Sequence, residues 1–298
     1  MEALIRQFLI LDMWNLGLNL VVVVLGGVYL LLTSQWGVHR FAGESVRPGQ
    51  KVLFLLGLCS LYGCLGSPIV LIGHELFSVH MLQQSLLYLV MPPLLIRGLP
   101  VWMWRRGFAE KWMQILFLPA QRPLISLVLF NGLFSLYHVP RVFDMLMSSE
   151  LLHLFSHFVL ILSAMLMWWP VMNPVKEQVN LTPLGKLAYI AGAGVLLTPA
   201  CALIIFADHL LFASYSESGQ MFSILSPLDD QQLGGVIMKV IQEVVYGVML
   251  GIVFFQWARE ERAKEESEAV AAAVGRSAPN WHIRVLEGGK GSGEKGRG

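Results

Sequence analysis

The stretch 151–170, LLHLFSHFVLILSAMLMWWP, decides the fold. It is an apolar run about as long as the roughly 20 residues that a helix needs to cross a bilayer. His153 and His157 stand near its start, four residues apart, so on a helix both imidazoles lie on one face with roughly 6 Å between their Cβ atoms. This spacing suits two ligands of one metal ion, but two histidines one turn apart also occur by chance in helices. The topology decides between these interpretations, because it shows which other side chains reach the same membrane face.

The composition indicates an all-α integral membrane protein. The chain of 298 residues is 55% hydrophobic and 14% charged, with a mean hydropathy of +0.62, against about 25% charged residues in a typical soluble domain. Seven apolar runs predict a seven-transmembrane-helix bundle within residues 1–257; the runs are 15–33, 52–72, 78–97, 123–139, 151–171, 186–207 and 232–256. Residues 258–298 are charged and then rich in Gly and Ser, which predicts a disordered tail.

Basic residues in the loops predict the orientation. Lys and Arg gather in the first, third and fifth loops and at the start of the tail, while the second and sixth loops have none and the fourth has only Arg141. Because cytoplasmic loops are enriched in Lys and Arg, we expect the N-terminus outside and the C-terminus in the cytoplasm. In the third loop, residues 101–118 mix tryptophans with basic residues, which predicts a helix lying in the membrane interface. With a net charge of +1 and no basic groove, nucleic-acid binding is not expected.

This topology places several possible metal ligands at the outer face. His80 falls in the first turn of the third run, His153 and His157 begin the fifth, and His138 ends the fourth. The complete set of candidate ligands is His80, His138, His153, His157, Met81, Asp144 and Asp230. Ionisable groups at membrane depth are costly unless paired, hydrated or liganded, and imidazole with thioether sulfur favours copper. The alternative is that these histidines bond carbonyls freed at helix ends or lie in water at the membrane interface, which we expect for His74 and His209.

Four segments resemble the CtaG-type cytochrome c oxidase assembly factors of bacteria: SVHMLQQSLLYLVMPPLLIRGLP (78–100), LFSLYHVPRVFDMLM (133–147), LLHLFSHFVLILSAMLMWWP (151–170) and LDDQQLGGVIM (228–238). The resemblance implies a seven-span inner-membrane protein that is not an enzyme. It also implies a role in delivering copper to the oxidase, with oxidase subunits, other copper chaperones and membrane lipid as partners.

The resemblance also assigns residues. The family's histidines match His80, His138, His153 and His157, and its polar positions match Asp144, Asp230 and Gln231. The chain differs at Gln84, because family members usually read HMLQH where this sequence reads HMLQQ.

Two other classes of protein fit the residues. An intramembrane zinc hydrolase would use the same histidines with Asp144 or Asp230 as acid or base and an open metal position. A copper or proton transporter would need polar residues through the whole membrane thickness, and 86–96 and 158–168 contain few. We therefore expect the transporter least.

Overall fold

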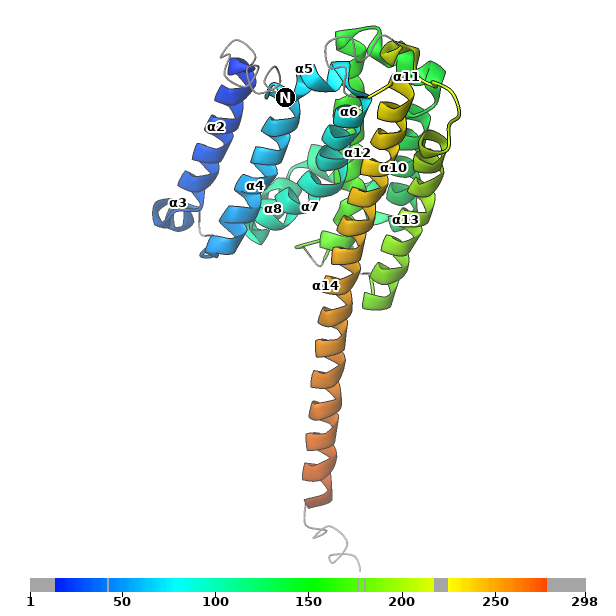
Figure 1. Ribbon diagram of the computed structural model, residues 1–298. Coiled ribbons are helices and arrows are strands. Elements are labelled where there is room, and N and C mark those ends of the chain that lie inside the picture. The colour runs from blue at the N-terminus through cyan, green and yellow to red at the C-terminus, as the bar shows by residue number, and fades with distance from the viewer. Residues whose placement is uncertain (1–13, 42, 176, 180, 217–224, 278–298) are drawn as a thin grey trace, which may run out of the picture. The chain divides into compact units, whose positions relative to one another are not determined.

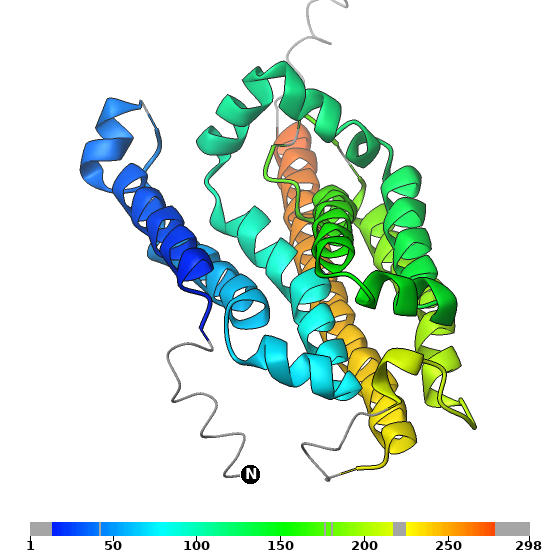
Figure 2. The same ribbon diagram turned by 90° about the horizontal axis from the view of Figure 1, so that it is seen from above.

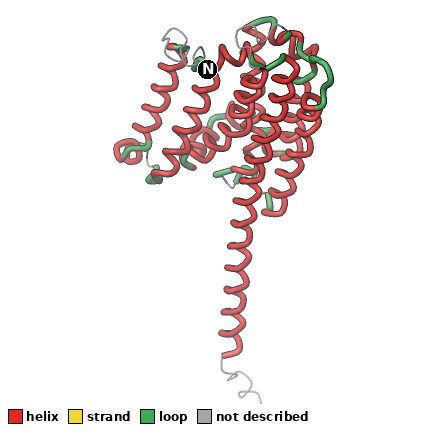
Figure 3. The backbone as a smooth tube through the Cα atoms, viewed as in Figure 1, coloured by secondary structure: helices red, strands yellow, loops and turns green. Residues whose placement is uncertain are grey.

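The computed structural model describes residues 14–41, 43–175, 177–179, 181–216 and 225–277. Over these residues the chain is helical with no β-strand (Figure 3). The α-helices are α2 (Leu16–Leu32), α3 (Gln35–Arg40), α4 (Pro48–Leu65), α5 (Ile69–Glu75), α6 (Phe77–Ser85), α7 (Met91–Gly98), α8 (Val101–Ala109), α9 (Lys111–Leu116), α10 (Pro123–Tyr137), α11 (Pro140–Met147), α12 (Glu150–Met172), α13 (Pro183–Ile205) and α14 (Pro227–Ser277). A π-helix, η2 (Leu86–Val90), joins α6 to α7, and short 3-10 turns occupy η3 (Pro119–Gln121) and η4 (Ala213–Tyr215).

A helix occupies each of the seven predicted runs. Among the described residues, five are long and apolar enough to cross a membrane: α4, α6 with η2 and α7, α12, α13 and α14. The bent pair α10 and α11 makes a sixth if it counts as one span, and α2 is apolar but has only 17 residues. The prediction of an all-α membrane protein is therefore confirmed, while the count of seven crossings and the orientation stay predictions.

Prolines explain where the apolar runs are interrupted. Pro92 has no N–H for the carbonyl of Tyr88, four residues earlier, and the helix widens there into η2. The Tyr88 carbonyl instead accepts a hydrogen bond of 3.0 Å from Trp168 Nε1 on α12. A freed backbone group thus finds its partner inside the bundle, as a membrane interior requires.

The fourth run is broken for a related reason. His138 ends α10, Val139 is extended and Pro140 starts α11, because a residue before proline avoids the helical region. The two helices meet at 77°. The second run breaks in the same way at Pro68, so that the short helix α5 is separated from α4.

The first unit of the chain, Met1–Gly251, is a bundle of closely packed helices. Figures 1 and 2 show α2 beside α4, with α6, α7, α10, α12 and α13 grouped together. Small residues allow this close approach. A Cβ atom at Gly98 of α7 would lie 2.5 Å from the Phe54 backbone nitrogen of α4, and one at Gly234 of α14 would lie 2.6 Å from Phe77 of α6. α5, the start of α6 and α11 lie at one end of the bundle, and α3 and α8 at the other (Figure 1).

The loop predicted to lie in the membrane interface forms α8 and α9. Trp112 is exposed, as a headgroup anchor would be, but Trp104 is 5% exposed and packs on Trp169 with ring centroids 4.7 Å apart. Its indole donates to the Ile96 carbonyl at 3.1 Å. Trp104 is therefore a core residue that attaches α8 to the bundle, which the sequence alone did not indicate.

The second unit, Ile252–Gly298, begins within α14. α14 continues to Ser277, so residues 258–277 are helical where the sequence predicted a disordered tail. This segment is rich in Glu, Lys, Arg and Ala, which are strong helix formers, and Lys264 pairs with Glu261 one turn away at 3.6 Å. Residues 278–298 lie outside the described part of the chain.

Candidate metal centre

Four histidines from three helices gather at one end of the bundle. The ring centroid of His80 on α6 lies 5.6 Å from that of His153 and 6.1 Å from that of His157, both on α12. The rings of His153 and His157 are 4.5 Å apart, and His74 at the end of α5 lies 5.5 Å from His153. We call these four residues the histidine cluster. α5, α6 and α12, which carry them, are labelled in Figure 1.

Hydrogen bonds direct the ring nitrogens toward one another. The Nε2 atoms of His153 and His157 are 3.0 Å apart, and the Tyr88 hydroxyl lies 2.5 Å from Nδ1 of His157. His80 Nε2 lies 2.9 Å from Nε2 of Gln84 and 3.1 Å from the Tyr137 hydroxyl. Because an amide NH₂ can only donate, the lone pair of His80 Nε2 faces Gln84. The Nε2 atoms of His80, His153 and His157 are thus engaged in hydrogen bonds, and a bound metal ion would have to replace these bonds.

The cluster runs from the surface into the core. His74 is exposed, His153 is half-buried, His157 is 6% exposed and His80 is 2% exposed. Tyr88 lies deeper still and is fully buried. An ion entering at His74 would therefore lose contact with water as it moved toward His157.

The arrangement is close to that of a metal site but does not reach it. Among the described residues, no three His, Cys, Asp or Glu side chains are placed to hold one metal ion. With metal–nitrogen bonds of about 2.0–2.1 Å, a tetrahedral ion holds two ligand nitrogens roughly 3.3 Å apart. The separation of 3.0 Å between the Nε2 atoms of His153 and His157 is within a few tenths of an ångström of that value. Gln84 Oε1 is also buried, with no hydrogen-bond partner in the described structure.

His138 lies apart from the cluster. Its Nδ1 bonds the Phe134 carbonyl at 2.8 Å, and its Nε2 is buried with no partner among the described residues. Its ring contacts there are with Phe134 and Tyr137. His138 thus makes the carbonyl bond that the sequence offered as the alternative, and the ring of Tyr137 contacts both His138 and His80.

The two aspartates cap the start of other segments. Asp230, at the start of α14, is 2% exposed and accepts from the Phe77 backbone nitrogen at 2.6 Å and from both the nitrogen and the hydroxyl of Ser78. These groups belong to the first two residues of α6, the helix that carries His80. Asp144 accepts from Ala213 and Ser214 at 2.7–3.1 Å. The contacts of both carboxylates position the surroundings of the cluster, and a role as metal ligands stays a prediction.

Met81 lies at the contact between α6 and α14. It is fully buried, and a Cβ atom at Gly234 of α14 would lie 3.0 Å from its Cγ. Its thioether thus belongs to the contact between α6 and α14. Ligation by Met81 also stays a prediction.

The loop after α13 closes over the same end of the bundle. Gln231 accepts from the Leu211 nitrogen at 2.8 Å, and the Tyr215 hydroxyl donates to the Gly73 carbonyl at 2.7 Å, next to His74. Burial raises the pKa of Tyr215 well above its usual range, so this hydroxyl keeps its proton. His209, by contrast, is exposed and pairs with Asp208 at 2.6 Å, and that hydrogen bond lowers the pKa of Asp208.

Sequence reasoning missed three members of this neighbourhood. Tyr88 stands eight residues after His80, which is about two helical turns and thus the same face, so spacing alone could have found it. Spacing could not have revealed Tyr137, because it meets His80 through the close approach of α10 to α6. His74 is exposed, as the alternative expected, but its ring also meets that of His153 edge-on, with centroids 5.5 Å apart.

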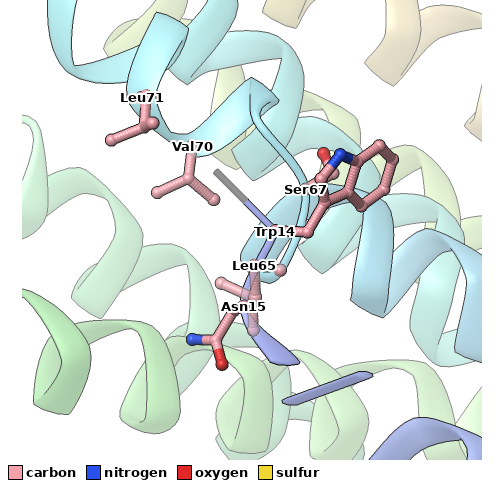
Figure 4. Close-up of a pocket in the computed structure, with 7 residues that line it drawn as sticks. Trp14, Asn15, Leu65, Ser67, Val70 and Leu71 are labelled. Atoms are coloured by element: carbon pink, nitrogen blue, oxygen red, sulfur yellow. The ribbon is translucent and has the colours of Figure 1, made fainter. Parts of the chain in front are cut away.

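A pocket of about 280 Å³ lies elsewhere, between the start of α2 and the α4–α5 junction (Figure 4). Its lining is Trp14, Asn15, Leu65, Gly66, Ser67, Val70 and Leu71. None of the histidines lines it. The pocket is therefore separate from the candidate metal centre.

The chain is similar to known proteins over most of its length. A family described as cytochrome c oxidase caa3 assembly factor (Caa3_CtaG) matches residues 27–260. An uncharacterised protein of Mycobacterium leprae, ML1998, is 24% identical over 243 residues, and one of Mycobacterium bovis, Mb0105, is 23% identical over 240 residues. These matches cover 74% and 75% of this chain but 36% of each relative, so the chain spans about a third of their length. No solved structure matches.

Proposed function

This chain belongs to the family of cytochrome c oxidase caa3 assembly factors, and from that membership we propose that it holds copper at the histidine cluster and assists its delivery to the catalytic subunit of the oxidase. The copper ion is cargo and no bond of a substrate is broken, so the protein acts without catalysis. Its partners are oxidase subunits and other copper chaperones, and its place is the bacterial inner membrane.

The pairing of His153 and His157 is the observation that supports this proposal most. Two neutral imidazoles whose Nε2 atoms are 3.0 Å apart can chelate one soft ion by a small outward rotation of each ring. The ring of His80, 5.6 and 6.1 Å from theirs, supplies a third nitrogen. Imidazole suits copper well.

The gradient of exposure suits transfer between proteins. A carrier must take up its ion from an aqueous donor and release it to an acceptor by exchange of ligands. His74 and His153 are open to an incoming ligand, whereas His157 and His80 are covered. The buried histidines can thus hold the ion while the ligands on its exposed side are exchanged.

The carboxylates do not favour the hydrolase. A zinc hydrolase needs a water-activating acid or base beside an open metal position. Asp230 is fully engaged with the start of α6, and Asp144 with the segment at Ala213 and Ser214. We therefore do not propose a hydrolytic reaction.

The test is the copper content of the purified protein and of the oxidase. In a strain with His157→Ala, we expect oxidase subunits to be present at normal levels but low in copper and in activity. The matched control is His39→Ala, because His39 lies on α3 at the other end of the bundle and, among the described residues, its ring bonds the Gln35 carbonyl at 2.7 Å. Equal copper and oxidase activity in the His157→Ala strain and its parent would overturn the proposal.

A further inference from the structure

Two charged side chains stand in the middle of α14. Between Asp230 and Arg259, the only charged residues are Lys239 and Glu243. Glu243 is 13 residues from Asp230 and 16 from Arg259 by sequence number, and this apolar stretch has the length of a membrane crossing. A charge at that depth is costly and marks a functional position by default.

In this pair Lys239 faces the neighbouring helix α13, and Glu243 faces away from the bundle. Lys239 Nζ bonds Glu243 at 2.6 Å and the Thr198 hydroxyl of α13 at 2.9 Å. The side chain of Lys239 is 28% exposed, and that of Glu243 is 63% exposed. In the described structure the polar contact of Glu243 is with Lys239, so its second carboxylate oxygen faces outward.

Glu243 stands on an apolar face of α14 that no other helix of the described chain covers. Val236, Val240, Val244 and Val248 are each 42–59% exposed, and their spacing of four residues puts them on one side of the helix. Gly247, one turn after Glu243, has open space where a Cβ atom would stand. Another helix can therefore approach the backbone closely here.

We propose that this face of α14 binds a transmembrane helix of a cytochrome c oxidase subunit, which donates a hydrogen bond from an uncharged side chain to Glu243. The proposal rests on the proposed function and names its partner surface. An assembly factor whose described residues are mostly apolar helices must meet its client largely within the bilayer. Lys239 already neutralises Glu243, so the partner helix needs a donor and not a second cation.

A second copy of this chain fits the face less well. A two-fold axis parallel to α14 and beside this face would place Glu243 next to the Glu243 of the other copy. Two carboxylates can only accept hydrogen bonds, so neither would supply the donor that the other lacks. A neutral Ser, Thr, Asn, Gln or Tyr on a client helix supplies that donor to the free oxygen.

The test is photo-crosslinking of the full chain in cells that make the oxidase. A benzoylphenylalanine residue at Val244, next to Glu243, should give an adduct that contains peptides of an oxidase subunit. The matched control carries the same probe at Val128 on α10, which is 62% exposed and should give no such adduct. In the double variant Lys239→Met, Glu243→Leu, the adduct at position 244 should fall at least tenfold while the chain stays in the membrane in normal amount. Replacing an ion pair by apolar residues is often tolerated, so this variant separates binding from folding.

Several results would overturn the inference. One is an adduct of the chain with itself, since the face would then join two copies. Another is an adduct unchanged in the double variant together with a lower melting temperature, because the pair would then only hold α13 to α14. No adduct at position 244, in cells where loss of the gene still lowers oxidase copper, would reject this surface and leave the proposed function standing. Normal oxidase after loss of the gene would instead reject the proposed function.

Discussion

Gln84 is the position at which this chain departs from the motif it otherwise resembles. On α6 it lies one turn below His80, and its amide nitrogen is 2.9 Å from His80 Nε2. Residue 84 therefore faces His80. A glutamine amide is a poor ligand for copper, and imidazole is a good one, so the site as proposed has one strong ligand fewer than a histidine would give.

Restoring that ligand should tighten copper binding. For Gln84→His we expect an affinity higher by about tenfold or more, because even the outer partners of metal ligands change affinity by about 10–100-fold. Competition with a chelator of known strength measures it, with Gln84→Ala as the matched control. If all three proteins bind copper equally, residue 84 does not face the ion.

At the residue scale, the sequence predicted the histidines better than the aspartates. The spacing of His153 and His157 and the shared depth of His80 follow from helical periodicity and loop charge alone. The partners of Asp230 do not, because they are backbone N–H groups more than 150 residues away in the chain. A carboxylate that caps a distant helix and one that binds a metal look alike in a sequence.

At the scale of elements, α6 depends on a cap that another helix provides. The first N–H groups of a helix have no partners within it, and Asp230 of α14 supplies them for α6. This contact fixes the start of the helix that carries His80. Asp230 is thus a positioning residue for the candidate centre.

Removing this cap should destabilise the protein. For Asp230→Ala we expect a loss of about 1–3 kcal/mol, the usual cost of leaving buried donors unsatisfied, seen as a lower melting temperature in detergent. Asp229→Ala is the matched control, since Asp229 is exposed and, within the described part of the chain, its hydrogen bonds are with Ser226 in its own turn. Copper affinity should fall with Asp230→Ala and recover in part with Asp230→Asn, which keeps one acceptor. Equal melting temperatures for the two alanine variants would contradict this role.

The breaks between elements were only partly predictable. Proline lacks the N–H that continues a helix, and α4 ends just before Pro68 while η2 stands just before Pro92, but Pro199 lies inside α13. The π-helix η2 and its bond from Trp168 to the Tyr88 carbonyl were not expected, because they depend on which helix lies alongside. Sequence shows where a backbone carbonyl loses its partner, and only packing shows which side chain replaces it.

At the scale of the whole molecule, the orientation in the membrane remains to be tested. Seven crossings with the N-terminus outside predict that reporter fusions after Ser149 behave as extracytoplasmic and fusions after Lys111 or Lys264 as cytoplasmic. The physical reason is the gathering of Lys and Arg in alternate loops. A cytoplasmic signal at Ser149 would place the histidine cluster on the wrong side for an outer copper donor.

In the predicted topology, in which α10 crosses the membrane, the break at Pro140 also affects the lipid around the protein. α10 has 15 residues, which is about 22 Å at 1.5 Å per residue, while the hydrocarbon of a bilayer is about 30 Å thick. Since α11 turns away by 77° and adds little length across the bilayer, acyl chains beside α10 must shorten or tilt to match it. We expect a local dimple in the leaflet next to His138, which brings headgroups and water down toward the buried rings from the side as well as from the end.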